Sequence, residues 1–376
     1  MKTEIVKGFN DFTGEDAVKR AEIKKILVEI FEKYGFEPAE TPLVEYEEFV
    51  KGDNEKDEAV SDIFKLQDKG KRKLALRYEF TFQLKRLMQN RKLPYKRYQI
   101  GEVFRDEPTS ANRFRQFTQC DVDIIGSTAK DEAEILALAS EVMKELGING
   151  TIFVNNRKLL NEILSEQKVK NNLEVIKELD KLGKLSEKEI KANLKKYDAE
   201  KILGVIKKPE SYFKKYESYK EIQELKKYCD IYGVKINFQP SLARGLAYYN
   251  GNVFEIKTNE AENTITAGGS YMFNNVQSTG ISFGLDRLSN FAKLKFEEDT
   301  YLVVSLNQNK EAIKLAQNLR SDGKSVAMCY GKPSKALEYA NSYDIAKVIF
   351  VGEKEVKAKT FKIKDMKSGK ENELKI

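Results

Sequence analysis

The sequence of 376 residues contains no histidine. This absence excludes a Ser-His-Asp triad, a histidine general base and every metal site built on imidazole ligands. Any chemistry must therefore use carboxylates, arginine and lysine, hydroxyl groups, groups of the substrate or a bound cation. No metal site from histidine or cysteine is expected.

Cysteine is scarce as well. The three cysteines, Cys120, Cys229 and Cys329, lie too far apart in the sequence for a zinc knuckle or a disulfide framework. No apolar run is long enough to span a bilayer, and Met1–Asn10 lacks the apolar core of a signal peptide. We therefore expect a cytoplasmic protein in a reducing compartment, without a membrane partner.

The chain is long for one domain, and its 41% of hydrophobic residues are enough to fill a folded core. The net charge of +7 is unevenly placed. Residues 156–235 carry 20 Lys and Arg against 14 Asp and Glu, and residues 299–376 carry 15 against 10. Basic segments attract a polyanion, although lysine-rich solvated helices would give the same counts.

The first 155 residues predict a mixture of helices and strands. Apolar residues recur at spacings of three and four from Ile23 to Tyr34, and Thr13 with Asp16 resembles a capping box at the start of this helix. The other elements expected are strands at 98–104, 117–125 and 151–154, a helix at 131–146, and a hairpin loop at 105–116.

The rest of the chain shows two further patterns. Residues 156–235 read as helix throughout, and strands return at 251–256 and 280–283 before a helix at 285–291. One antiparallel α+β domain, 1–155 and 236–298, interrupted by a helical insertion, 156–235, is the simplest account. Strands and helices then alternate from 301 to 351, which predicts a small α/β domain over 299–376 with a mainly parallel sheet.

An arginine cluster falls in the predicted hairpin loop. Arg105, Arg113 and Arg115 lie in or beside it together with Glu107. Guanidinium groups bind a phosphate chain through bidentate contacts and stay charged. A surface loop of self-neutralising ion pairs fits the same residues.

Three other stretches carry candidate chemistry. GISFGLDRLSNF, 280–291, turns from a strand into a helix that bears Arg287. LARGLAYYNGNVFEI, 242–256, places one arginine before paired tyrosines and an expected turn at Asn250–Gly251, although such tyrosines also pack cores. In LRYEFT, 76–81, Glu79 and Thr81 would alternate onto one face of a short strand.

Together these stretches resemble the class II aminoacyl-tRNA synthetases, and within them the histidyl family. KGFNDFTGED resembles the N-terminal signature of that family, FRDEPTSANRFRQFTQ its motif 2 loop and GISFGLDRL its motif 3. ARGLAYYNGNVFE is similar to the histidine-specific motif. The C-terminal segment is similar to the anticodon-binding domain, so the resemblance covers nearly the whole chain.

The resemblance implies ATP-dependent ligation of L-histidine to tRNA(His) through a histidyl-adenylate, with ATP and Mg²⁺ as cofactors and Mg²⁺ bound through ATP. Arg105, Arg244 and Arg287 would be the catalytic residues. The implied ATP-binding residues are Arg105, Glu107, Arg113, Phe117 and Arg287. The implied histidine-binding residues are Glu79, Thr81, Gln119, Asp123, Arg244, Tyr248, Tyr249 and Tyr271.

The sequence departs from the family pattern around one of these tyrosines. In AGGSYMF, Ser270 and Met272 stand where the family has arginine and aspartate. A homodimer is implied by the kinship, with Leu43–Phe49 resembling the interface motif. The main rival is a non-catalytic paralogue that acts as a regulatory subunit or sensor. Such relatives tend to lose the catalytic arginines, which are present here.

Overall fold

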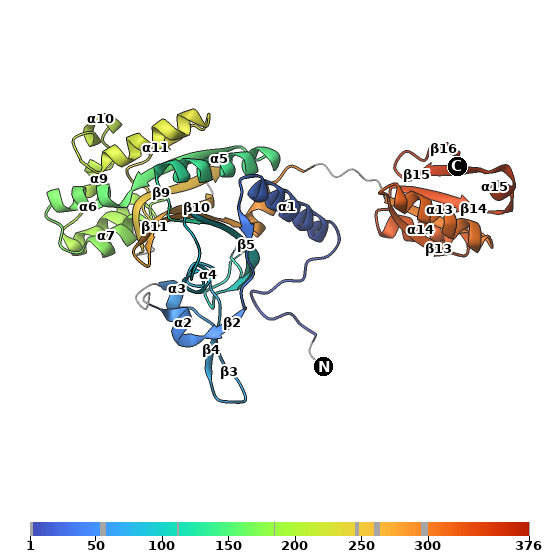
Figure 1. Cartoon of the computed structure of the whole chain (residues 1–376), viewed down its shortest axis with the longest axis horizontal. Coiled ribbons are helices and arrows are strands. Elements are labelled where there is room, and N and C mark those ends of the chain that lie inside the picture. The colour runs from blue at the N-terminus through green and yellow to red at the C-terminus, as the bar shows by residue number, and fades with distance from the viewer. Residues whose placement is uncertain are drawn as a thin grey trace. The chain divides into compact units, whose positions relative to one another are not determined.

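The computed structural model describes residues 3–52, 58–110, 113–183, 185–244, 248–258, 264–294 and 300–375. The chain divides into two compact units, Met1–Leu294 and Lys295–Ile376 (Figure 1). Each unit has its own sheet and its own clusters of buried apolar residues. Each therefore has the apolar core that a separate domain requires.

The described part of the larger unit contains a sheet of eight strands in the order β1-β5-β6-β11-β10-β9-β7-β8. The end pairs β1·β5 and β7·β8 are parallel and the others are antiparallel. The strands are β1 (Glu37–Pro38), β5 (Tyr95–Phe104), β6 (Gln116–Ile125), β7 (Gly150–Asn156), β8 (Ile236–Phe238), β9 (Tyr249–Thr258), β10 (Thr264–Phe273) and β11 (Val276–Gly284). The antiparallel sheet is confirmed, and β10 is a strand that the sequence patterns did not predict.

One face of this sheet is covered by helices α1 (Gly14–Lys33), α5 (Ala129–Glu145) and α12 (Leu285–Phe291). Along β6 the apolar residues Cys120, Val122 and Ile124 are fully buried in one cluster with Leu27 of α1 and Leu138 of α5. The residues between them are polar and point to the opposite face, because successive side chains of a strand alternate. The core therefore lies under the helices, and the polar face is left for a site.

The helical segment that follows β7 packs into the same core. It comprises α6 (Arg157–Glu166), α7 (Asn172–Leu179), α8 (Glu187–Leu194), the 3₁₀ turn η1 (Lys195–Tyr197), α9 (Ile202–Val205), α10 (Glu210–Phe213) and α11 (Tyr219–Ile231). Its buried residues belong to the cluster beneath the sheet, and α11 contacts α5. The all-helical reading of this segment is confirmed, while its status as a separate domain stays a prediction.

A smaller sheet, β2-β4-β3, lies on the other side of the large sheet from α5 (Figure 1). It consists of β2 (Val44–Tyr46), β3 (Lys65–Gln67) and β4 (Lys73–Leu76), with short helices α2 (Glu47–Lys51), α3 (Glu58–Ser61) and α4 (Leu84–Leu87) beside it. The strand expected over residues 76–81 is wrong, because β4 ends at Leu76. Arg77 turns inward and donates to the carbonyl oxygens of Thr41 and Glu102, each at 2.7 Å, which draws the chain out of the strand.

Two local predictions are also wrong. Thr13 precedes α1, but its side chain makes no capping hydrogen bond. Asn250 and Gly251 lie inside β9 rather than in a turn. Pairing of the flanking residues, Tyr249 and Val253 with β10 and Asn252 with β7, holds this segment extended, so the tertiary ladder overrides the local turn preference of an Asn-Gly pair.

The smaller unit is an α/β domain. Its strands, in the order β13-β12-β14-β15-β16, are β12 (Thr300–Ser305), β13 (Ser325–Tyr330), β14 (Lys347–Val351), β15 (Thr360–Asp365) and β16 (Glu371–Lys375). Its helices are α13 (Asn309–Ser321), α14 (Pro333–Ser342) and α15 (Glu353–Ala358). The first three strands are parallel, as predicted, and the last two are antiparallel additions.

Candidate functional site

The polar face of the large sheet, which we call the site face, is organised by strand register. Arg97 on β5 and Gly280 on β11 both lie opposite Asp123 on β6. Cross-strand partners share a face of the sheet, so these residues lie side by side. A β-carbon added at position 280 would overlap Oδ1 of Asp123 and lie 2.9 Å from its Cγ. Glycine is therefore required at 280 for the carboxylate to occupy its place.

The hairpin loop between β5 and β6 contains arginines that are neutralised by ion pairs and one arginine, Arg105, that no described carboxylate neutralises. Glu107 is buried and forms an ion pair with Arg113, and Arg115 pairs with Asp106 at 3.1 Å. This part of the loop is self-neutralising. Arg105 differs, because within the described residues no carboxylate pairs with it.

Arg105 is fixed in place by two other contacts. Its Nε donates to the carbonyl oxygen of Tyr78 at 3.2 Å, and its guanidinium carbon lies 5.1 Å from the centre of the Phe117 ring. A cation over an aromatic face is held by the ring quadrupole while its remaining N–H groups stay available. Arg105 is therefore oriented without being neutralised.

The other predicted arginines lie within electrostatic range of this loop. Burial lowers the pKa of Arg287. The positive charges of Arg244, Arg113 and Arg105 lower it further. Glu255 opposes them and forms an ion pair with Arg244 at 2.7 Å. Like charges repel at this range, so the cluster favours an anionic ligand that would neutralise it.

Three tyrosines form an aromatic wall next to these arginines. The ring centres of Tyr248 and Tyr249 are 4.6 Å apart, and those of Tyr248 and Tyr271 are 5.8 Å apart. Burial raises the pKa of Tyr249, Arg244 acts against this rise, and Glu79 adds to it. Glu79 is itself buried, in the loop after β4. The wall thus lies between a carboxylate and a cation.

Asp123 lies at the base of this wall. Its Oδ1 accepts a hydrogen bond from the Tyr271 hydroxyl at 2.5 Å, and its Oδ2 pairs with Nη2 of Arg97 at 2.7 Å. Asp123 also contributes to the raised pKa of Tyr249. Register and hydrogen bonding thus fix the carboxylate that the resemblance assigns to imidazole recognition, and the assigned phenol of Tyr249 lies within its electrostatic range.

Gln119 presents an unpaired acceptor on the site face. Its Nε2 donates to Ser282 at 2.8 Å, and its Oε1 is buried without a hydrogen-bond partner in the described structure. A buried acceptor that lacks a donor is costly and is expected to bind a donor from a ligand. Thr81 is half-buried two residues beyond Glu79, in the loop that replaces the expected strand.

Two buried charged residues of this face were missed by the sequence analysis. Arg97 is fully buried, and Asp121 is 5% exposed. Burial raises the pKa of Asp121 to about 7, with Arg97 acting against the rise and Asp123 adding to it. The available signal was strand alternation, which places residues 97, 121 and 123 on one face once the strand predicted at 98–104 is extended by one residue and the register is known.

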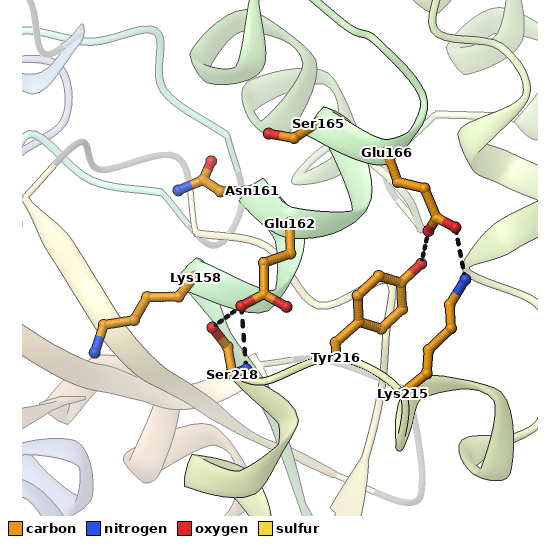
Figure 2. Close-up of a pocket in the computed structure, with 8 residues that line it drawn as sticks. All are labelled: Lys158, Asn161, Glu162, Ser165, Glu166, Lys215, Tyr216 and Ser218. Atoms are coloured by element: carbon orange, nitrogen blue, oxygen red, sulfur yellow. Dashed lines mark hydrogen bonds and ion pairs between the residues drawn. The ribbon is translucent and has the colours of Figure 1, made fainter.

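A polar hollow lies away from the site face, in the helical segment (Figure 2). Glu162 of α6 accepts hydrogen bonds from the Ser218 amide and hydroxyl at 3.1 and 2.5 Å. Glu166 accepts from Lys215 at 2.6 Å and from the Tyr216 hydroxyl. These groups satisfy one another, and none of the predicted site residues lines the hollow.

Two findings concern metals and membranes. In the described ranges no group of three or more Cys, Asp and Glu residues is arranged to hold a metal ion. Every helix of the described chain is too short or too polar to cross a membrane.

Comparison with protein-family models identifies the family of this chain. Residues 8–288 match the family model described as Histidyl-tRNA synthetase. The chain belongs to the histidyl-tRNA synthetase family. A second model, described as Anticodon binding domain, matches residues 300–376 of this synthetase. The resemblance seen in the sequence motifs is therefore confirmed, and so is the class II fold with its C-terminal domain.

Curated relatives extend along the whole synthetase. Histidine--tRNA ligase 1 of Bacillus cereus is 35% identical and the match covers 100% of this chain and 98% of the relative. Histidine--tRNA ligase of Helicobacter pylori is 32% identical over 97% of this chain and 94% of its own. The chain is thus an enzyme of the aminoacyl-tRNA synthetase class, and its family supports aminoacylation of tRNA(His) with the use of ATP.

Solved structures agree on the fold. A histidyl-tRNA synthetase from Nostoc sp. PCC 7120 superimposes with a TM-score of 0.86 at 24% identity, covering 100% of this chain and 97% of that one. A Bacillus halodurans protein described as an ATP phosphoribosyltransferase regulatory subunit/histidyl-tRNA synthetase gives 0.77 at 22% identity, covering 93% and 98%. The same fold therefore occurs in a protein whose description includes a regulatory subunit.

The departure at Ser270 and Met272 falls on the opposite face of β10 from Tyr271. The Ser270 hydroxyl donates to buried Glu132 of α5, behind the sheet, and Met272 is half-exposed. Glu132 also accepts from Asn252 at 2.6 Å. Neither substitution lies on the site face, since alternate residues of a strand point to opposite sides.

Proposed function

We propose that this synthetase joins L-histidine to tRNA(His) in two steps, through a histidyl-adenylate formed on the site face. The observation that supports this most strongly is that the Arg105 and Arg244 guanidinium groups both act electrostatically on the buried Arg287, and that Arg244 also acts on Tyr249, which lies within range of Asp123. A cationic cluster only partly neutralised by Glu255, next to a pocket with a carboxylate and a phenol, suits a phosphate chain beside an imidazole. Residues 1–155 and 236–298 would form the catalytic domain, with an insertion at 156–235 and an anticodon-binding domain at 299–376.

In the first step a carboxylate oxygen of histidine attacks the α-phosphorus of ATP, and the bond to pyrophosphate breaks. Arg105 holds the α-phosphate and stabilises the charge that develops there, while Arg287 and Arg113 contact the outer phosphates. Arg244 lies at the junction of the carboxylate and the phosphate. Mg²⁺ bound to the phosphates would share the neutralisation.

The adenine and the histidine occupy opposite ends of the site. Phe117 stacks on the adenine ring, and Glu107 accepts from its amino group once Arg113 has moved to the phosphates. The amino group of histidine is held by Glu79, Thr81 and the unpaired Oε1 of Gln119.

The imidazole ring lies between Asp123 and Tyr249, which match its two nitrogens. Tyr248 and Tyr271 complete the aromatic wall around it.

In the second step a hydroxyl of the terminal adenosine of tRNA attacks the activated carbonyl carbon, and AMP leaves. The C-terminal domain would bind the anticodon, as the matching family model indicates. Leu43, Val44 and Tyr46 are each more than 40% exposed at β2, in the segment expected to form a homodimer interface. A dimer, Mg²⁺ and a cytoplasmic location stay predictions.

The test is ATP–pyrophosphate exchange with each of the twenty amino acids in the absence of tRNA. Exchange with histidine alone, followed by histidine-dependent charging of tRNA(His), is the expected result. Exchange with another amino acid would overturn the assignment of specificity. Folded protein without exchange would contradict the catalytic proposal and favour a regulatory subunit, the other activity named for a protein of this fold.

A further inference from the structure

We propose that Arg97 is a positioning residue that sets the recognition of the histidine side chain by fixing the Asp123 carboxylate. The inference rests on the proposed function, because the contact between Asp123 and the imidazole of histidine is part of that proposal. None of the motifs that identify the family includes a role for Arg97.

Arg97 is the largest fully buried side chain of the described structure, with no exposed area. Its Nη2 pairs with Asp123 at 2.7 Å and lies 3.4 Å from the carbonyl oxygen of Phe80. Its Nε and Nη1 have no hydrogen-bond partner among the described residues. Two buried guanidinium nitrogens without a partner are costly, and apolar side chains in place of the whole Arg97–Asp123 pair would serve the core at least as well. Core stability therefore does not account for this arginine.

The contact of Arg97 does account for the geometry of Asp123. The carboxylate is held at both oxygens, by Arg97 at Oδ2 and by the Tyr271 hydroxyl at Oδ1. Gly280 leaves the space that this orientation needs. A carboxylate held at both ends keeps its remaining lone pairs in a fixed direction, so it accepts from a ring N–H without reorganising.

The charge of Arg97 acts on two buried carboxylates, because it pairs with Asp123 and also opposes the rise in the pKa of Asp121. Asp121 and Asp123 are two residues apart on the same face of β6, and Arg97 is directly opposite Asp123 on β5. Arg97 therefore has two separable effects, which are to balance the charge of a buried layer and to orient one of its members. Only the second effect makes Arg97 a determinant of specificity.

The experiment compares kinetic constants of full-length variants in ATP–pyrophosphate exchange. Arg97→Met removes the contact and the charge, and Arg97→Met combined with Asp121→Asn removes one carboxylate as well, so that the net charge of the layer is retained. Arg97→Lys restores the cation. Arg91→Met, at an exposed arginine near the same strand, is the matched control. Thermal unfolding and direct histidine binding by calorimetry accompany each variant.

We expect the KM for histidine to rise about 10- to 100-fold in Arg97→Met and in the double variant. Without Arg97 the Asp123 carboxylate is no longer held in the direction that its hydrogen bond to the imidazole requires. The KM for ATP should stay within about twofold, because the loss is confined to the histidine end. Arg97→Lys should recover part of the loss, and the Arg91→Met control should match the wild type.

Three results would overturn the inference. A double variant with the wild-type KM for histidine would show that Arg97 only balances charge. Equal changes in both KM values with a lowered unfolding temperature would show a structural role. A wild-type protein that neither binds histidine nor supports exchange would contradict the proposed function itself. The first two results, by contrast, would contradict only the role of Arg97.

Discussion

Glu132 provides a sharp test of the electrostatics behind the sheet. This residue of α5 is buried, and it accepts hydrogen bonds from Ser270 and Asn252, both neutral. Burial raises its pKa from the ordinary value of 4.5 to about 7, and Glu221 and Glu224 of α11 add to the rise. We predict that Glu132→Gln stabilises the protein at alkaline pH, because glutamine keeps the shape and hydrogen bonding of the neutral acid and cannot ionise.

The sign follows from the order of the two pKa values. The folded state binds the Glu132 proton more tightly than the unfolded state, so its stabilising contribution is complete below pH 4.5 and is lost as the pH rises to about 7. A difference of about 2.5 units corresponds to about 3 kcal/mol in the free energy of unfolding. About 2 kcal/mol of this falls between pH 5.5 and 8.5.

The assay is urea unfolding of the wild type and Glu132→Gln, followed by far-ultraviolet circular dichroism from pH 5.5 to 8.5. Subtracting the two curves removes other titrating groups such as Asp121. The variant should gain about 2 kcal/mol relative to the wild type across this range. Glu134→Gln is the control on the same helix, and it should destabilise by breaking the 2.6 Å pair with Lys96. A Glu132→Gln difference that does not change with pH would refute the reasoning.

Four further predictions concern the site and the smaller unit. Gly280→Ala should raise the KM for histidine in pyrophosphate exchange, because the added β-carbon overlaps Asp123, and an unchanged KM would contradict the fit. Arg105→Ala should lower kcat about 100- to 1,000-fold in single-turnover adenylate formation, whereas a change in KM alone would exclude a role in the transition state. Tyr271→Phe should raise the KM for histidine about 10-fold at constant KM for ATP. Ile349→Ala, in the core of the smaller unit, should cost about 2–5 kcal/mol in urea unfolding and reduce tRNA charging while pyrophosphate exchange persists.

The sequence alone determined the elements whose signal is local. The apolar spacing from Ile23 to Tyr34 predicted α1, because a helix buries residues three and four apart whatever it packs against. The alternation from Phe117 to Ile125 predicted β6 in the same way. The regular exchange of strands and helices after residue 300 predicted the smaller unit. Linear motifs identified the family, because each motif is a contiguous stretch of the chain and can be read without knowledge of the fold.

The tertiary structure decided which side chains meet. Glu79 lies in a loop and not on a strand, because the buried Arg77 draws the chain away after β4. Asn250 and Gly251 lie within a strand, because pairing of the flanking residues with β7 and β10 outweighs the local turn preference of an Asn-Gly pair.

Register is the physical reason why the site could be predicted only in part. A shift of one residue between β5 and β6 would move Arg97 away from Asp123, and no local pattern fixes that register. The same alternation places Tyr271 in the site and its neighbour Ser270 behind the sheet. The sequence thus determined which residues carry the chemistry, and the pairing of distant strands decided which of them act together.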